Sequence, residues 1–209
     1  VFQAIADLIF ESAIVSLAVA LAGTAIFLVV VYGVLLGRPT LGVANLVPIV
    51  VTVAALAATM RLVGISLNAF TATVLAITIG LGIDYSVHIV HRFTDELEEQ
   101  GESAAERDPL VALRRTITGT GGALTGSVLT TVFGIGVLVL AVFPAIGQFG
   151  LLTALSVVYS YIASILVLPS VLVVWSRLTG AGSRAGTRDE ADASGSDASD
   201  GATARGEVE

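Results

Sequence analysis

Five long apolar stretches dominate this sequence, and they decide what kind of fold it can adopt. A helix needs about 20 mostly apolar residues to cross the hydrocarbon core of a bilayer. The stretches occupy residues 13–36, 43–60, 68–90, 122–143 and 148–175. With 55% hydrophobic residues, 13% charged residues and a mean hydropathy of +0.93, the chain is far more apolar than a soluble domain. We therefore predict an all-α fold, a polytopic membrane helix bundle with five transmembrane helices.

Polar segments divide the rest of the chain. Residues 1–12 carry Asp7 and Glu11 between apolar residues, which predicts an amphipathic lead-in to a transmembrane domain over residues 13–178. In the polar loop 91–121, the helical spacing of apolar residues from Leu110 to Ile117 predicts a short amphipathic helix on the membrane surface. Residues 179–209 have too little apolar surface to offset the entropy of ordering, so we expect a disordered acidic tail.

The charged residues and the absence of cysteine limit the possible functions. Without cysteine the chain has no disulfide and no thiolate metal site. A net charge of −7 without a basic patch argues against a nucleic-acid partner. All the basic residues are arginine, a composition that, with the abundance of acids, is typical of a GC-rich genome and a high-salt cytoplasm, as in halophilic archaea.

The arginines predict an orientation in the membrane. They follow the first, third and fifth stretches, at Arg38, at Arg92, Arg107, Arg114 and Arg115, and at Arg177, Arg184 and Arg188. The opposite side carries only Arg61. Because positive charge gathers on the cytoplasmic side, we expect a multi-pass protein of the cell membrane with its N-terminus outside and its C-terminus in the cytoplasm.

One carboxylate interrupts the third apolar stretch. Asp84 lies within residues 68–90, where an ionised side chain is costly unless it has a partner or a function. Asp84, His88 and His91 follow one another at helical spacing, so they share one helix face with Gly80. This pattern predicts a proton relay through Asp84 and His88. The alternatives are that Asp84 only ties helices together, and that His88 only packs or contacts headgroups.

Further polar residues could support such a relay. Tyr85 points about 100° away from Asp84 around the helix, so it suits a carboxylate on another helix, or it is simply a core aromatic. Ser127, Thr130 and Thr131 in the fourth stretch could hydrogen-bond to Asp84 or to a chain of water molecules, or serve only as small packing residues. No nucleophile is paired with a base, so we expect no enzymatic activity. Asp84, His88 and His91 could suggest a metal site, but all three lie on one helix and the chain has no other His and no Cys, so we predict no metal site. We also predict no cofactor.

Several motifs together resemble a known family. Residues 80–92 read Gly-Leu-Gly-Ile-Asp-Tyr-Ser-Val-His-Ile-Val-His-Arg, and further motifs lie at 41–48, 126–134, 147–155 and 168–169. Over about residues 1–178 the chain resembles the RND superfamily, in its MMPL and sterol-sensing-domain-like branch. Members of that family have two homologous halves, each with one helix, a large extracytoplasmic domain and five further helices. The resemblance implies that this chain is the five-helix block of the C-terminal half, and that residues 1–12 leave an upstream extracytoplasmic domain.

The resemblance also implies a function and partners. It implies a proton-motive-force-driven exporter of lipids or hydrophobic compounds that works in the lipid bilayer. Asp84 would be the proton-coupling carboxylate, and Tyr85 the partner of the equivalent carboxylate in the other half. That other half would be upstream sequence, a separate chain or a second copy. Two alternatives share the fold: a sterol- or lipid-sensing module without transport, and a SecDF-like accessory of protein translocation.

Overall fold

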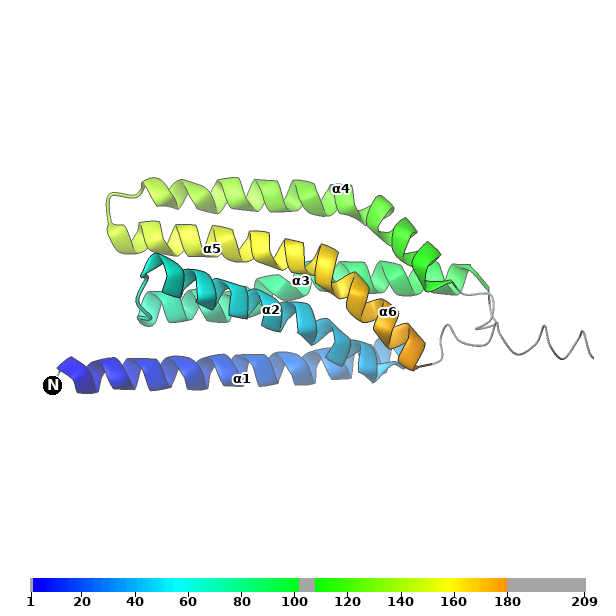
Figure 1. Ribbon diagram of the computed structural model, residues 1–209, viewed down its shortest axis with the longest axis horizontal. Helices are drawn as coiled ribbons and strands as arrows, with labels where there is room; N and C mark the ends of the chain where they lie inside the picture. The colour runs from blue at the N-terminus through cyan, green and yellow to red at the C-terminus, as the bar shows by residue number, and fades with distance from the viewer. Residues whose placement is uncertain (1, 102–107, 180–209) are drawn as a thin grey trace, which may run out of the picture.

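The chain folds into a bundle of five helices of membrane-spanning length (Figure 1). The computed structural model describes residues 2–101 and 108–179, and within these ranges it contains helices and no strands. The elements are α1 (Phe2–Leu36), α2 (Pro39–Val63), α3 (Ala69–Glu99), α4 (Pro109–Gly136) with a 3-10 turn (Val137–Leu140), α5 (Pro144–Ile162), a π-helical turn (Ala163–Val167) and α6 (Leu168–Leu178). The predicted all-α membrane bundle is confirmed. The expected tail beyond Thr179 lies outside the described residues.

Local sequence explains where the helices begin and end. Pro39, Pro109, Pro144 and Pro169 each stand in the first turn of a helix, where a missing N–H costs nothing. Gly64 closes α2 in the left-handed conformation (φ 77°), which glycine adopts readily. At the start of α4, the carboxylate of Asp108 accepts a hydrogen bond of 2.8 Å from the backbone N–H of Leu110.

Three predicted boundaries differ from the structure because helices continue past the apolar stretches. The lead-in 1–12 and the first span are parts of the single helix α1. The third span does not end at residue 90, because α3 runs on to Glu99 and takes up the start of the predicted loop. The short amphipathic helix predicted near Leu110 is not a separate element but the first turns of α4, which slope away from the line of the rest of that helix (Figure 1).

The last two spans also differ in detail. The fourth span passes from α4 into the 3-10 turn and ends at Leu140, three residues before the predicted end. The fifth begins at Pro144 instead of residue 148, since this proline starts α5. α5, the π-helical turn and α6 then follow one another without a break and make one span from Pro144 to Leu178.

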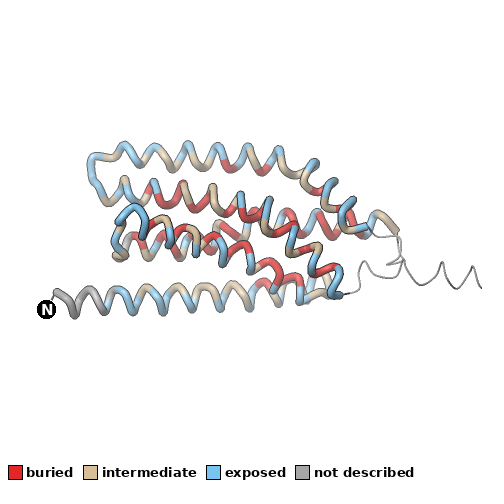
Figure 2. The backbone as a smooth tube through the Cα atoms, in the orientation of Figure 1, coloured by how far each residue is buried: buried red, intermediate tan, exposed pale blue. Residues whose placement is uncertain are grey.

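Burial separates the inner helices from the outer ones. In their most apolar windows, half of α3 and 44% of α2 are buried, compared with 6% of α1 and 11% of α4. Figure 2 shows the same division, with buried residues gathered on α2, α3 and α5. α1 and α4 therefore lie at the edges of the bundle, with many apolar side chains facing outward where lipid would surround them.

The edge helix α1 is held against α2 by a close backbone approach. A Cβ atom at Gly42 would come within 2.7 Å of the backbone of Leu28, so only glycine allows this contact. Near this contact the buried Asn45 donates a hydrogen bond of 3.3 Å from its Nδ2 to the hydroxyl of Tyr32. α1 is thus fixed to the core near its C-terminal end.

Candidate functional site

A groove between α3 and α4 collects most of the predicted relay residues. It encloses about 420 Å³. The groove is lined by Leu81, Asp84, Tyr85, His88, Thr120, Ala123, Leu124, Ser127 and Thr131. The polar side chains come from one face of each helix, because the positions on α3 and those on α4 both follow helical spacing. The sequence therefore brings an acid, an imidazole and several hydroxyl groups to one place.

Asp84 is the unpaired charge of this groove. Its side chain is exposed on the surface of the bundle. Within the part of the chain that the structure describes, its carboxylate accepts no hydrogen bond and forms no ion pair. An ionised carboxylate within a membrane-spanning segment is costly unless it has a partner or contacts water.

Tyr85 lies beside Asp84 but on the buried side of the groove. It is 7% exposed, and its ring packs edge-on against Tyr161 of α5, with the ring centroids 6.5 Å apart. It lines the groove together with Ser127 and Thr131 of α4. Tyr85 therefore joins α3 to α4 and α5 and presents its phenol to the same groove that Asp84 lines.

The hydroxyl groups of α4 do not contact Asp84 as expected. Thr131 lines the groove, yet its hydroxyl donates to the carbonyl oxygen of Ser127 on its own helix at 2.9 Å. Thr130 does not line the groove, and its hydroxyl donates to the carbonyl oxygen of Gly126 at 2.9 Å. Such bonds to the preceding turn satisfy a hydroxyl group without a second helix. Among the described residues, the donor for Asp84 that we expected from this helix is therefore absent.

The stripe that contains Asp84 is the open face of α3. Ile77, Gly80, Asp84, His88 and His91 are all exposed. His91 stands beyond the groove, where its Nδ1 lies 3.1 Å from a carboxylate oxygen of Asp95. The open face thus continues the pattern read from the sequence.

The opposite face of α3 is packed into the core. A Cβ atom at Gly82 would lie 3.5 Å from the Ser160 hydroxyl of α5 and 3.6 Å from the Ile49 side chain of α2. Ser86, one turn further, is fully buried and donates to the carbonyl oxygen of Gly82 at 3.0 Å. α3 therefore separates a closed interior from an open polar surface.

Sequence reasoning missed two polar residues near this helix. Thr120 lines the groove, and its place at helical spacing before Ser127 and Thr131 was a usable signal. Glu96 was assigned to an acidic loop, but it lies within α3 and is only 4% exposed. The apolar pair Phe93 and Leu97, one helical turn apart, was the sign that the helix continues.

Glu96 forms an ion cluster with two arginines. One of its carboxylate oxygens lies 2.6 Å from Nη2 of Arg92, one turn earlier on α3. The other lies 3.7 Å from Nη1 of Arg115 on α4. The cluster links the end of α3 to the beginning of α4.

Comparison with known sequences decides the family. The sequence model of the MMPL family matches residues 1–191, which is most of the chain. The chain belongs to the MMPL family. It is thus a multi-pass membrane protein of a transporter family, and its groove lies on the open face of α3.

Two relatives of this MMPL protein illustrate the range of lengths. A protein of Methanocaldococcus jannaschii, described as a membrane protein, is 29% identical over 171 residues, which are 82% of this chain and 42% of the relative. The apo-petrobactin exporter of Bacillus anthracis is 33% identical over 98 residues, 47% of this chain and 12% of the relative. The chain thus spans less than half the length of either relative.

Proposed function

We propose that this MMPL protein is part of an exporter driven by the proton-motive force, with lipids or other hydrophobic compounds as substrates. The observation that carries the proposal is the exposed and unpaired carboxylate of Asp84 at membrane depth, in a groove with Tyr85 and His88. Ionisable residues within membrane spans mark proton and ion pathways, so a carboxylate in this position fits a proton-coupled transporter. The proposal involves no covalent chemistry and no enzymatic step.

The proton would move along the open stripe of α3. Asp84 takes up a proton, which removes its charge and lowers the cost of its contact with an apolar environment. His88, one turn further along α3 on the same groove, relays the proton toward the end that carries Arg92. In this proposal that end faces the cytoplasm of the cell, and the N-terminus lies outside.

The groove is open because a second five-helix block belongs on this face. Tyr85 presents its hydroxyl to the groove, where a carboxylate from that block would accept its hydrogen bond. Both relatives extend well beyond the matched residues, which are 42% of the archaeal relative and 12% of the bacterial one. Of the arrangements that would supply a second block here, we propose a second copy of this chain as the partner.

Two observations support small hydrophobic molecules as the exported substrates. The bacterial relative is named an exporter of apo-petrobactin, which supports outward movement of a small molecule. The outward-facing apolar side chains of α1 and α4 would let a hydrophobic substrate approach from the bilayer. We therefore expect the substrate to enter from the membrane.

A gradient experiment tests the proposed energy source. The full-length protein would be expressed in cells loaded with the lipophilic dye Nile red, and efflux would be followed by fluorescence. We expect efflux above that of cells without the protein, and its loss when an uncoupler collapses the proton gradient. Efflux that continues without the gradient would contradict proton coupling. Absence of efflux for the dye and for extracted lipids alike would favour a lipid-sensing module.

A cross-linking experiment tests the proposed second copy. The chain has no cysteine, so single introduced cysteines report cleanly. Ile77 on the open stripe is 37% exposed, and Phe133 on the outer side of α4 is 72% exposed. We expect Ile77→Cys in the full-length protein to give a disulfide-linked dimer in membranes, and Phe133→Cys to stay monomeric. Equal yields from both variants would speak against a second copy on this face.

A further inference from the structure

The first turns of α4 carry a basic hollow that the transport proposal does not use. It encloses about 340 Å³ and is lined by Val111, Arg114, Arg115 and Thr118. These four residues are spaced at one helical turn and two turns, so they form one face of the segment that slopes away from the rest of α4 (Figure 1). All four are exposed. The hollow therefore opens away from the core.

The positive charge of this hollow is only partly balanced. Arg115 lies 3.7 Å from Glu96, and its side chain remains 58% exposed. Glu96 lies much closer to Arg92, at 2.6 Å, so most of its charge is compensated there. Arg114 forms no ion pair with any of the described residues. Arg92 and Arg115 thus share one carboxylate, and the uncompensated Arg114 together with the weakly paired Arg115 leaves positive charge at the hollow.

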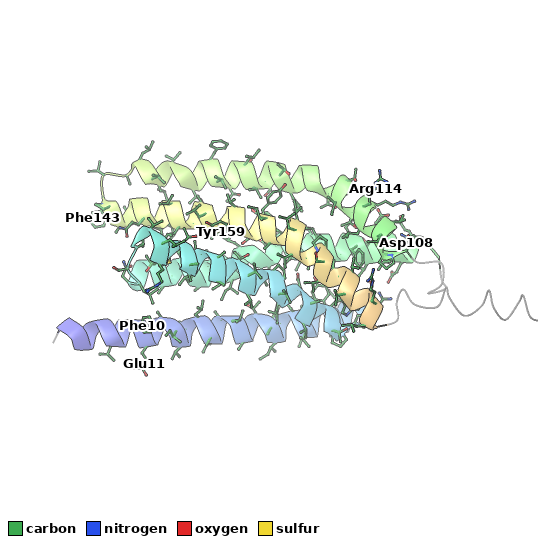
Figure 3. All side chains as sticks on the ribbon, in the orientation of Figure 1. Phe10, Glu11, Asp108, Arg114, Phe143 and Tyr159 are labelled. Atoms are coloured by element: carbon green, nitrogen blue, oxygen red, sulfur yellow. The ribbon has the colours of Figure 1, made fainter. Side chains whose placement is uncertain are left out.

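The hollow lies at the level expected for lipid headgroups. Figure 3 labels Arg114 and Asp108 at the end of the bundle opposite to Phe10, Glu11 and Phe143. α6 ends at the same end of the bundle, and there the indole N–H of Trp175 donates to the hydroxyl of Thr40 at 3.0 Å (Figure 1). Arg38 at the start of α2 and Arg177 in the last turn of α6 stand at this end too, and arginines at the ends of membrane spans reach the headgroup region. The arginines therefore lie where a phosphate group would meet them.

Apolar and polar surface meet at the hollow in the way a phospholipid requires. Leu110 is 59% exposed and Val111 is 41% exposed, and both flank the arginines on the sloping segment. Apolar side chains of this kind contact acyl chains while arginines reach the headgroup. The hydroxyl of Thr118 already donates to the carbonyl oxygen of Arg114 at 2.8 Å. The guanidinium groups therefore supply the hydrogen-bond donors for a ligand.

We propose that this hollow binds the phosphate of an anionic phospholipid, with Arg114 as the main contact and Arg115 as the second. A guanidinium group forms two parallel hydrogen bonds to phosphate oxygens, which a lysine cannot do. Bound lipid would hold the sloping turns of α4 at the membrane surface. Through Arg115 and Glu96 it would also fix the end of α3, the helix that carries Asp84. A lipid at this site therefore connects the composition of the membrane to the position of the relay helix.

Lipid co-purification tests the proposal with the full-length protein. The protein would be reconstituted in vesicles of equal parts phosphatidylglycerol and phosphatidylcholine, extracted gently, and its bound lipid measured by mass spectrometry. We expect enrichment of phosphatidylglycerol, and a loss of about fivefold in that enrichment for Arg114→Gln, the factor expected when one arginine near an anionic surface is removed. Because Arg114 has no ion pair to lose within the described residues, this variant is expected to fold normally.

Matched variants decide between lipid and other occupants. Arg177→Gln removes an exposed arginine at the same end of the bundle but outside the hollow, and we expect no change in enrichment. Equal losses of phosphatidylglycerol enrichment in Arg114→Gln and Arg177→Gln would contradict a specific site. General electrostatic attraction between arginines and the anionic membrane would then explain both losses. Displacement of the lipid by excess inorganic phosphate would show that the hollow binds a free anion and would contradict the proposal of a bound lipid. Phosphatidylglycerol enrichment could also appear only after the acidic residues of 180–209 are neutralised. That result would contradict the lipid proposal and indicate that the acidic segment itself binds the hollow.

Discussion

Two carboxylates on α3, Asp84 and Glu96, have opposite surroundings. They stand 12 residues apart, or about 18 Å along the helix axis. Glu96 is 4% exposed and is held by Arg92 and Arg115. Asp84 is exposed, and within the described residues no cation and no hydrogen-bond donor reaches it. The helix thus carries one acid that is fully paired near its end and one that is unpaired in its apolar middle.

The difference separates a structural role from a functional one. A paired and buried acid contributes through its fixed contacts, and removal of its charge leaves its cations uncompensated. An unpaired acid contributes little to the fold of this block, so its presence in an apolar stretch points to a role in binding a proton or a partner. Stability and transport should therefore respond to these two residues in opposite ways.

The largest effect is expected on transport. Asp84→Asn should lower proton-driven efflux by at least about 100-fold, the usual scale for loss of a proton-transfer group. Glu96→Gln should leave efflux within about threefold of the unchanged protein, because Glu96 lies outside the groove and far enough along α3 for the two sites to act independently. Both would be measured in cells with Nile red, at matched protein levels. A larger loss for Glu96→Gln than for Asp84→Asn would reverse the assignment.

The next largest effect is expected on the free energy of unfolding, where Glu96→Gln should have a larger effect than Asp84→Asn. Glu96→Gln should lower the free energy of unfolding by about 1 to 2 kcal/mol, because two arginines are left without their acid but are half exposed to water. Asp84→Asn should change it by less than about 0.5 kcal/mol. Trp175, the single tryptophan, is buried between α6 and α2, so its fluorescence reports thermal unfolding in detergent. Equal destabilisation by both variants would contradict the distinction between a structural role for Glu96 and a functional role for Asp84.

A smaller effect is expected for the tyrosine beside Asp84. Tyr85→Phe keeps the edge-on ring contact with Tyr161 and removes only the hydroxyl. Loss of one hydrogen bond should reduce efflux by about fivefold, close to 1 kcal/mol. Tyr161→Phe serves as the control, since its hydroxyl bonds to Thr125 outside the groove lining and its loss should leave efflux unchanged. The same loss in both variants would mean that packing, and not the phenol of Tyr85, matters for transport.

The smallest effect distinguishes the two arginines of Glu96. Arg92→Gln should cost about 1 kcal/mol of stability, and Arg115→Gln less than about 0.5 kcal/mol, since an ion pair at 3.7 Å with an exposed partner is screened by water. Thermal unfolding at low and high salt measures both. The cost of Arg92→Gln should fall as salt is added. A greater loss of stability for Arg115→Gln than for Arg92→Gln would show that the ion pair between α3 and α4 is the stronger of the two.

The sequence predicted the unpaired acid better than the paired one. Asp84 is a charge within an apolar stretch, and its spacing to His88 is enough to indicate the correct helix face. Glu96 stands in a run of acids, and hydropathy alone ends the third span six residues earlier. Its burial depends on Arg115, which is near it only once α4 folds back on α3. Contacts between distant segments of this kind cannot be read from local pattern.

The groove illustrates the same limit at shorter range. Periodicity placed Ser127 and Thr131 on one face of their helix, and the structure brings this face to the groove that Asp84, Tyr85 and His88 line, because one helix face is a property of spacing alone. It could not predict that the hydroxyl of Thr131 bonds to its own helix, since that depends on which rotamer the side chain adopts. Thr130 stands one residue before Thr131, about 100° around the helix. It therefore does not line the groove, whereas Thr131 does.

The contact of Gly42 with Leu28 makes α1 a lever with its pivot near one end. From Leu28 to Phe10 the helix extends about 27 Å, and along this arm most side chains face outward. A hollow of about 400 Å³ lies between the far part of the arm and α3, lined among others by Ser12 and Thr73. A tilt of about 10° at the pivot moves Phe10 by about 5 Å on that arm. Such a tilt would change the hollow that Ser12 and Thr73 line, and so the contact of α1 with α3, while the contact at Gly42 stays in place.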